Sequence, residues 1–403
     1  TSFRAEHAAV GTDIRHHAPF QHDRTLQGAK AHFLIIYVGM DVHTTNYTLC
    51  CYSMEDDRFF AEVQVEPDAK NILKYLARIE KQQSRDCRIV CGYEAGCLGY
   101  SLYHQLHAHG IDCVILAPTT MMTKPGKRIK TDRRDARLIS KCLAFHTYSP
   151  VYIPTEVDDA VKEYIRMRDD ANSALARVKQ QIIAFCIRHG KIHDGKSYWT
   201  NKHLEWLSSL DLGNKILSEV LQEYLIRYYQ LREQVDMYDM RINELAQAEP
   251  YRQKVEKLGC FRGIAAHTAL SFCVEVGDFR RFATAQQFAS YLGLVPGECS
   301  SGDKQQYTGI TKAGNSHLRK LLVETAQVFG RSATKSGKSV ALKERQAKCD
   351  SLTVAYADKA NARLKKKYFK IAMRSKVNIA KTAVAREMAC FIWGMMTDNI
   401  SCA

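Results

Sequence analysis

The run FLIIYVGMDV, residues 33–42, is almost entirely apolar until it reaches Asp41. A short continuous apolar run of this kind is typical of a strand that is buried on both faces. An acid at the end of a buried strand needs a partner, because leaving a charge buried and unpaired is costly. The stretch therefore predicts a central strand and, at its end, a polar site.

Strands and helices alternate in the residues that follow, and their order indicates the fold. Short apolar runs predict strands at 47–53, 59–65, 87–94 and 112–118, and helical spacing predicts helices at 67–83, 98–110 and about 131–145. The resulting order, β-β-β-α-β-α-β-α, is that of a ribonuclease-H-like (RuvC-like) α/β fold. We therefore predict such a domain over residues 33–150, preceded by a disordered extension at 1–32.

The remaining chain is predicted to be helical. Two long helical patterns, 157–187 and 215–247, fall in a region that we assign to residues 151–254 as a coiled-coil insertion. The second carries a heptad seam made of Leu217, Leu221, Tyr224, Tyr228, Leu231, Val235, Tyr238, Ile242 and Leu245. We expect this seam to form a helical hairpin or a contact between chains, and the alternative is packing within its own domain.

Two further helical segments follow. The pattern over residues 255–330 predicts a helix–turn–helix around Gly263 and a further helix at 284–297. It then predicts a loop that leads into a helix from Ser316. Residues 331–403 predict basic C-terminal helices.

The charge balance points to a polyanionic partner. Lys and Arg outnumber Asp and Glu by 58 to 43, and residues 331–376 alone carry 14 bases against 3 acids. A surface of this charge favours nucleic acid or an anionic membrane. No run of 18 apolar residues predicts a membrane span. The 14 cysteines fall mostly in apolar stretches without paired CxxC motifs, which indicates reduced thiols in a cytoplasmic protein.

Two acids at the start of a predicted helix extend the site at Asp41. In KTDRRDARLI (130–139), Asp132 and Asp135 lie three residues apart on one helix face. Acids in a first turn also stabilise a helix capped by Thr131, which is the simpler interpretation. Glu94 ends a predicted strand beside that of Asp41. Four carboxylates at one sheet edge would repel one another, and Mg²⁺ or Mn²⁺ would relieve that repulsion better than zinc.

Motifs in both halves of the chain resemble a known family. Asp41 in YVGMDVH, Glu94 in GYEAG, and the two acids of KTDRRDA resemble the DEDD tetrad of bacterial insertion-sequence transposases with a RuvC-like N-terminal domain. The stretch YLGLVPGECSSGDKQQYTGITKAGNSHLRKLLVE (291–324) resembles the C-terminal transposase domain of that family. The resemblance covers about residues 35–330.

The resemblance implies a recombinase that acts on double-stranded donor and target DNA. A serine of the C-terminal domain would attack the phosphodiester, and the family's Ser-Gly pair aligns with Ser301; Ser300 and Tyr307 are the alternatives. The family also implies a structured guide RNA, a homo-oligomer with sites shared between chains, and a nucleoid-associated protein of the bacterial cytoplasm. Site-specific DNA invertases belong to the same family.

Basic residues near these motifs are the predicted nucleic-acid contacts. Arg262 stands where the family usually has a proline, and it can supply a positive charge at the turn. The full set is Lys124, Lys127, Arg128, Lys130, Arg133, Arg134, Arg262, Lys304, Lys312, Arg319, Lys365, Lys366 and Lys367. Two other functions fit part of the pattern: a RuvC-like nuclease or junction resolvase, and a nucleic-acid-binding protein without catalysis.

Overall fold

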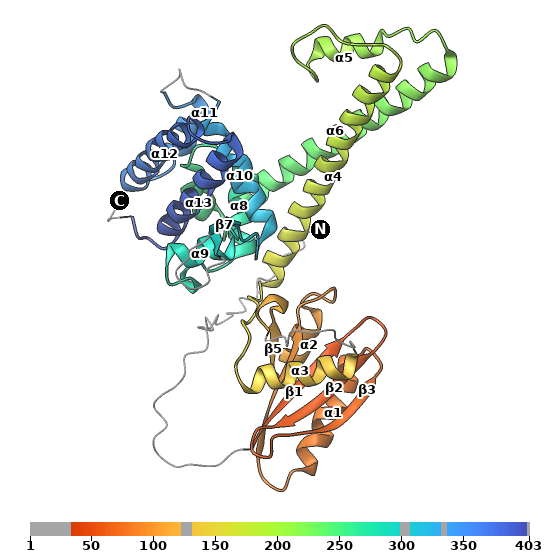
Figure 1. Ribbon diagram of the computed structural model, residues 1–403, viewed down its shortest axis with the longest axis vertical. Helices are drawn as coiled ribbons and strands as arrows, with labels where there is room; N and C mark the ends of the chain where they lie inside the picture. Colours follow the sequence, from red (N-terminus) through yellow and green to blue (C-terminus); the bar gives the residue numbers. More distant parts are fainter. Residues whose placement is uncertain (1–33, 122–130, 299–306, 332–336, 401–403) are drawn as a thin grey trace, which may run out of the picture. The chain divides into compact units, whose positions relative to one another are not determined.

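The computed structural model describes residues 34–121, 131–298, 307–331 and 337–400 (Figure 1). The chain divides into two compact units, Thr1–Ile153 and Pro154–Ala403, and each is considered by itself. The boundary falls close to the one predicted at residue 150.

The first unit is built on a five-stranded mixed sheet. Its strands are β1 (Leu34–Val42), β2 (Tyr47–Ser53), β3 (Arg58–Val65), β4 (Cys87–Glu94) and β5 (Asp112–Leu116), arranged β3-β2-β1-β4-β5. Strand β2 pairs antiparallel with β1 and β3, whereas β1, β4 and β5 are parallel. The predicted α/β class is confirmed, and the sheet is consistent with a ribonuclease-H-like domain. The parallel strands bring their carboxyl ends to one edge of the sheet.

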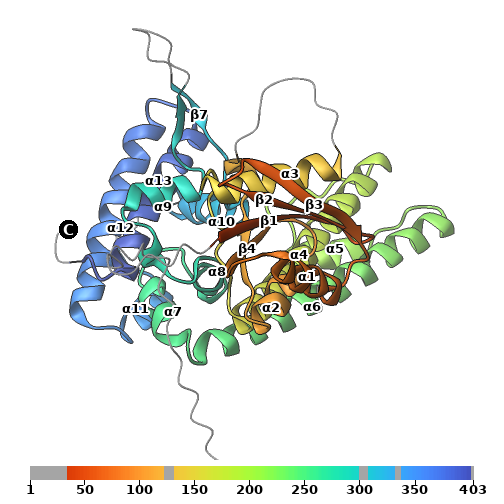
Figure 2. The same ribbon diagram turned by 90° about the horizontal axis from the view of Figure 1, so that it is seen from below.

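Helices cover both faces of this sheet, which explains why β1 is apolar on both sides. Helices α1 (Ala69–Gln82) and α2 (Ser101–Ala108) lie on one face, and α3 (Asp132–Ala144) lies on the other (Figure 2). A short 3₁₀ turn, Pro118–Thr120, follows β5. On the α1 side, Ile72, Leu76 and Leu106 are buried against the sheet, and on the α3 side Ile139 and Leu143 are buried.

Small residues let α3 approach the sheet very closely. A methyl group added to Gly39 of β1 would lie 2.1 Å from the carbonyl oxygen of Ala136 and 2.4 Å from the nitrogen of Ser140. Gly92 of β4 similarly faces the side chain of Leu143. Any side chain at Gly39 would therefore push α3 away from β1. This contact fixes the start of α3 beside the end of β1.

The second unit is mainly helical. Its helices are α4 (Glu156–Arg188), α5 (Asn201–Ser208), α6 (Lys215–Gln247), α7 (Arg252–Gly259), α8 (Ala266–Val276), α9 (Ala285–Tyr291), α10 (Ser316–Ala326), α11 (Val340–Gln346), α12 (Ser351–Ala372) and α13 (Val377–Met396). A small hairpin pairs β6 (Pro296–Glu298) with β7 (Tyr307–Ile310), and 3₁₀ turns occur at Phe279–Arg281 and Gln327–Phe329. Among the described residues, none of the helices is both long and apolar enough to cross a membrane.

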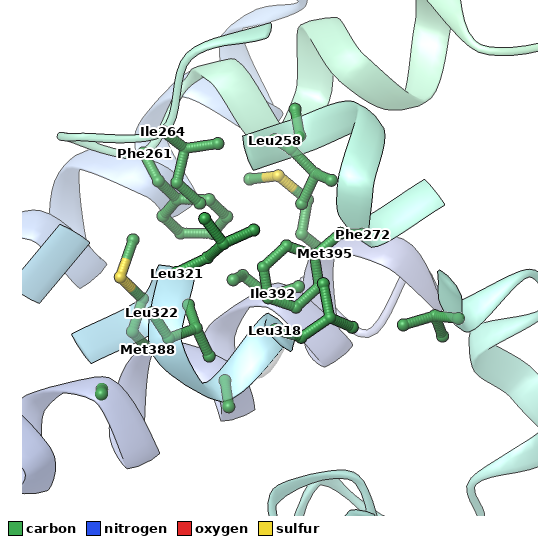
Figure 3. Packing of buried hydrophobic residues seen from close by; sticks show 14 of the residues in the cluster. Leu258, Phe261, Ile264, Phe272, Leu318, Leu321, Leu322, Met388, Ile392 and Met395 are labelled. Atoms are coloured by element: carbon green, nitrogen blue, oxygen red, sulfur yellow. The ribbon is translucent and has the colours of Figure 1, made fainter. Parts of the chain in front are cut away.

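One hydrophobic core joins segments that we expected to be separate domains. Figure 3 shows Phe261, Phe272 and Leu318 packed with Met388 and Ile392 of α13, and all five are fully buried. The C-terminal helices therefore belong to the same core as residues 255–330. The apolar residues of α13 recur every four residues, so one face of the helix can enter the core.

The predicted heptad seam is filled from within the chain. Helices α4 and α6 pack side by side and carry α5 at their far end (Figure 1). Leu221, Tyr228 and Val235 of α6 are buried in one cluster with Val178 and Ile182 of α4. Of the two forms that we expected, a helical hairpin and a contact between chains, the structure shows the hairpin within one chain. The reason is that α4 presents its own apolar face to α6.

The helix predicted at 284–297 is shorter in the structure. It ends at Tyr291, because Gly293 adopts a φ of 64° and the chain turns into β6. A side chain at Gly293 would also meet the carbonyl oxygen of Ala313 at 2.2 Å. The tight turn thus brings the loop before α10 against the end of α9.

Candidate active site

Asp41 and α3 form the centre of the candidate site. Helix α3 begins at Asp132. The hydroxyl of Thr131, the residue before it, accepts a hydrogen bond from the backbone N–H of Arg134 and so caps the helix. The cap interpretation is therefore correct. The first turn nevertheless also faces Asp41, because α3 lies against β1 at Gly39, two residues earlier on the same strand face.

Three side chains converge closely enough to share a metal ion. Asp41, His43 and Asp132 each offer one ligand atom, and these atoms lie within 4.8 Å of one another. His43 Nε2 lies 3.3 Å from Asp41 Oδ2. Within the described parts of the chain, Asp41 Oδ2 is buried and accepts no hydrogen bond. His43 Nε2 is thus an electrostatic neighbour of this oxygen without a hydrogen bond to it, and a cation between them would satisfy the oxygen.

The electrostatics of Asp41 also favour a cation. Burial raises the pKa of Asp41, and the nearby carboxylates of Asp135 and Asp132 raise it further, while His43 opposes the shift. The ionised form is thus disfavoured until positive charge is supplied. Asp135 is partly buried on α3, the helix that carries Asp132, and contributes to this repulsion.

Glu94 lies at the same sheet edge but outside the three-residue cluster. Met40 pairs with Tyr93 at the carboxyl end of the parallel strands β1 and β4, and Asp41 and Glu94 are the next residues on each strand. Its side chain is exposed. The structure thus brings Asp41, Asp132 and Asp135 together and places Glu94 on the neighbouring strand.

His43 is the site residue that the sequence argument missed. Residues 41 and 43 lie on the same side of an extended chain, so the two-residue spacing in DVH was an available signal. Carboxylates suit Mg²⁺ and Mn²⁺, and an imidazole is a better ligand for Mn²⁺ than for Mg²⁺. The donor set therefore fits a divalent cation.

Several predicted residues lie outside the described part of the chain. They are Ser300, Ser301, Lys304, Lys124, Lys127, Arg128 and Lys130. Tyr307 begins β7. The hairpin of β6 and β7 brackets residues 299–306.

The base of this hairpin is held by α10. Arg319 donates from Nη1 to the carbonyl oxygens of Leu292 and Ala313, at 2.9 Å each. Asn315 caps α10 by accepting from the N–H of Leu318. Arg319, expected to bind nucleic acid, therefore also has a structural task.

The other predicted basic contacts differ in their surroundings. Arg133, Arg134, Lys312 and Lys366 are exposed. Arg262, Lys365 and Lys367 are partly buried, and Lys367 pairs with Glu387 at 2.6 Å. The exposed bases are thus the more accessible to phosphate groups.

A second polar cluster, which sequence reasoning missed, joins three helices of the second unit. His317 of α10 contacts Asp169 of α4 through Nε2 at 2.7 Å and Glu275 of α8 through Nδ1 at 2.5 Å. His267 of α8 lies 3.0 Å from the other oxygen of Asp169. Burial would lower the pKa of His317, but its two carboxylate partners raise it to about 9. A protonated His317 therefore links α4 and α8 to the helix that follows the hairpin.

Comparisons with known proteins match both halves of the chain. A family model for DEDD transposases matches residues 38–187, which include the four predicted acids. A second model, described as the transposase IS116/IS110/IS902 family, matches residues 256–344. The two matches follow the order of the predicted catalytic and serine-containing regions.

Individual relatives agree with these models. A putative transposase, y4qE, of Sinorhizobium fredii is 36% identical over 307 residues, which cover 76% of this chain and 75% of the relative. The transposase for insertion sequence element IS1533 of Leptospira borgpetersenii is 32% identical over 340 residues, covering 83% and 95% of the two chains. The transposase for IS1111A of Coxiella burnetii is 26% identical over 268 residues, covering 63% and 71%.

Proposed function

Because the chain belongs to the IS116/IS110/IS902 family of insertion-sequence transposases, we propose that it cuts and rejoins double-stranded DNA with the acids around Asp41 and the hydroxyl of Ser301. Membership of a transposase family implies a DNA-cutting and rejoining enzyme. The observation that carries the proposal is the buried, unsatisfied Oδ2 of Asp41 beside two further aspartates. Such an arrangement destabilises the chain unless it binds something positive.

The acids would hold one or more divalent cations. Asp41, Glu94, Asp132 and Asp135 would supply carboxylate oxygens, and His43 would supply a ring nitrogen. A bound Mg²⁺ or Mn²⁺ would act as a Lewis acid toward the phosphate oxygens. The carboxylates would fix the position of the bound cation. Arg133 and Arg134 are exposed on α3, the helix that also carries Asp132 and Asp135, and they would hold the flanking phosphates.

Ser301 would provide the nucleophile. Attack of its hydroxyl oxygen on a phosphodiester forms a P–O bond to serine, breaks the bond to one strand end, and releases that end as a hydroxyl. The serine proton leaves to a base or to water, and the departing strand-end oxygen takes up a proton from an acid or from water. Because one P–O bond replaces another, the reverse attack by a strand-end hydroxyl can rejoin DNA without an added energy source.

Two partners complete the proposal. The family resemblance supports a structured guide RNA that pairs with donor and target DNA, and the excess of 58 bases over 43 acids suits two polyanions. The same resemblance supports a homo-oligomer whose active sites are shared between chains.

A covalent-adduct assay tests the proposed function. Protein incubated with its DNA and co-purified RNA is denatured, digested and analysed by mass spectrometry for a phosphorylated residue. We expect the adduct on Ser301, with loss in Ser301→Ala but not in Ser300→Ala. Asp41→Asn should abolish the adduct and leave DNA binding intact.

Other outcomes identify other functions. Cut DNA with free ends and no adduct would indicate a RuvC-like nuclease or resolvase. Cleavage that persists in excess EDTA would contradict the metal site. Sequencing of the rejoined products separates transposition from site-specific inversion.

A further inference from the structure

A hollow of about 490 Å³ lies between α9, α12 and α13 of the second unit. Three cations line it, Arg363 and Lys367 from α12 and Arg386 from α13. Three aromatic residues also line it: Tyr356, Phe391 and Trp393. The combination of bases and rings in one concave place has no role in the site described above.

The cations at this hollow are only partly neutralised. Glu387, whose side chain is 11% exposed, pairs with Arg363 through one oxygen and with Lys367 through the other. Within the described parts of the chain, no carboxylate lies within ion-pair distance of Arg386. Three positive groups thus face a single carboxylate, and the hollow keeps a positive charge that an anion would balance.

The aromatic walls are held in place by hydrogen bonds at their polar ends. Tyr356 donates from its hydroxyl to the carbonyl oxygen of Phe391 at 3.2 Å, and its ring meets that of Phe391 edge-on at 5.8 Å. Trp393 donates from Nε1 to the carbonyl oxygen of Phe282 at 3.1 Å. The guanidinium of Arg363 lies 5.8 Å from the centre of the Phe391 ring. Tyr356 itself is buried in the core, so the partly exposed rings of Phe391 and Trp393 form the surface beside the cations.

The cations suit the phosphate of a nucleotide, and the aromatic rings suit its base. Guanidinium groups bind phosphate with paired hydrogen bonds, and aromatic rings stack on bases of any sequence. Gln286 and Asn399 at the rim add side-chain amides, which can pair with the edge of a base. A volume of this size lies in the range of small-ligand sites.

We propose that this hollow binds one unpaired nucleotide of a single-stranded segment of nucleic acid. A base inside a duplex is stacked and paired, so it cannot enter a concave site without being extruded. A flat basic surface, by contrast, would bind duplex and single strand through phosphates alone.

The inference deepens the proposed function, since the strands that a recombinase handles supply unpaired nucleotides, and so does a structured guide RNA. Helices α12 and α13, which provide the three cations and the three aromatic residues, lie beyond the two family matches at 38–187 and 256–344, whereas Gln286 of α9 lies within the second match.

Fluorescence anisotropy with the full chain tests the site. The probes are a labelled single strand of about 12 nucleotides, as DNA and as RNA of the same sequence, and the matching DNA duplex. The variants are Arg386→Gln, which removes the unpaired cation, and Phe391→Leu, which removes a ring but keeps an apolar side chain. Lys366→Gln, an exposed base on α12 that does not line the hollow, is the control.

Arg386→Gln and Phe391→Leu should each weaken single-strand binding about tenfold, because a phosphate contact or a stacked ring at one nucleotide is lost. Each variant should change duplex binding less than about twofold. Lys366→Gln should weaken both probes by the same factor. If the two variants weaken binding of the RNA single strand alone, the ligand is RNA; if they weaken binding of the DNA single strand alone, it is DNA; if they weaken both, the site accepts either.

Equal losses for duplex and single strand, or no loss in correctly folded variants, would overturn the proposal. Melting temperatures identify a variant that is merely misfolded. The binding assay needs no cleavage. Its outcome is therefore independent of whether Ser301 or the acid cluster performs the proposed reaction.

Discussion

Asp41 shows how a candidate catalytic side chain can lower the stability of the protein that carries it. Its carboxylate is largely buried, lies near two other aspartates, and has one oxygen without a hydrogen bond among the described residues. Repulsion in this cluster opposes folding whenever no cation is bound. The cluster of acids therefore favours the binding of a cation.

Asp132→Asn should therefore make the metal-free protein slightly more stable. Removing one negative charge relieves repulsion worth about 0.5 kcal/mol at a partly exposed site. The same change should weaken stabilisation by Mg²⁺ or Mn²⁺. Thermal unfolding in EDTA and in each metal measures both effects, and a variant that is less stable in EDTA yet fully stabilised by metal would contradict the assignment.

His317 predicts a second stability effect, which depends on pH. Its pKa is raised from 6.5 to about 9 in the folded chain, so its contribution is fully present below pH 6.5 and is lost as the pH rises through about 9. Despite their burial, the pKa values of Asp169 and Glu275 are lowered by their histidine partners, so those contributions are lost in acid instead.

The measurement is the free energy of unfolding between pH 6 and about 8.5, below the range in which the buried thiols, whose pKa values burial raises, also affect stability. We expect a loss of roughly 2–3 kcal/mol across this range in the wild type and a much flatter profile in His317→Gln. His104→Gln, which changes a partly buried histidine of α2 with no such pair of carboxylates, should keep the wild-type profile. A parallel slope in His317→Gln would show that other groups cause the pH dependence.

The packing of α3 on β1 is what turns separate acids into a cluster. Gly39 lies two residues before Asp41, and Ala136 directly follows Asp135, so the closest helix–strand contact lies next to the site. A change in that contact alters the distance between the acids on β1 and those on α3. Catalysis should consequently be sensitive to a residue that has no functional group.

Gly39→Ala should destabilise the chain by about 3 kcal/mol and abolish cleavage, because the added methyl group would meet backbone atoms of α3. Gly96→Ala is the matched control, since its added methyl group would meet only Glu94 O, at 3.9 Å. Unfolding and DNA-cleavage assays test both variants. Normal cleavage in Gly39→Ala would mean that α3 does not need this close approach.

The whole molecule carries its positive charge unevenly. Residues 331–376 hold 14 bases and 3 acids. Some of these bases form ion pairs within the chain: Lys338 pairs with Asp358, and Arg363 pairs with Glu387. Lys366 and Lys370 of α12 are exposed and have no ion pair among the described residues. These two lysines are thus available to phosphate groups.

Replacing Lys366 and Lys370 together by Gln should flatten the dependence of log K for duplex DNA on log salt by about 2 units, because each lost phosphate contact removes about 0.9. A matched change of Lys74 and Lys81, exposed on α1 opposite α3, should leave the slope unaltered. The slope comes from binding titrations at several salt concentrations. An equal effect of both pairs would indicate a general charge effect rather than contacts at α12.

The amino-acid sequence by itself determined the elements and the chemistry of the candidate site. Strand β2 and helix α6 match their predicted bounds, 47–53 and 215–247, because apolar spacing records which face of a segment is buried. Asp41, Asp132 and Asp135 could be placed at one edge because parallel strands end together. The match fails at 284–297, where Gly293 ends the helix.

Only the tertiary structure decided which surfaces meet. It placed α4 in the seam of α6, brought α13 into the core, added His43 to the acids, and joined His317 to Asp169, 148 residues away. A local pattern states that a face is apolar or that a group can ionise, but not what lies opposite. That choice depends on packing between distant segments, since burial and charge pairing lower the free energy only once both partners are in place.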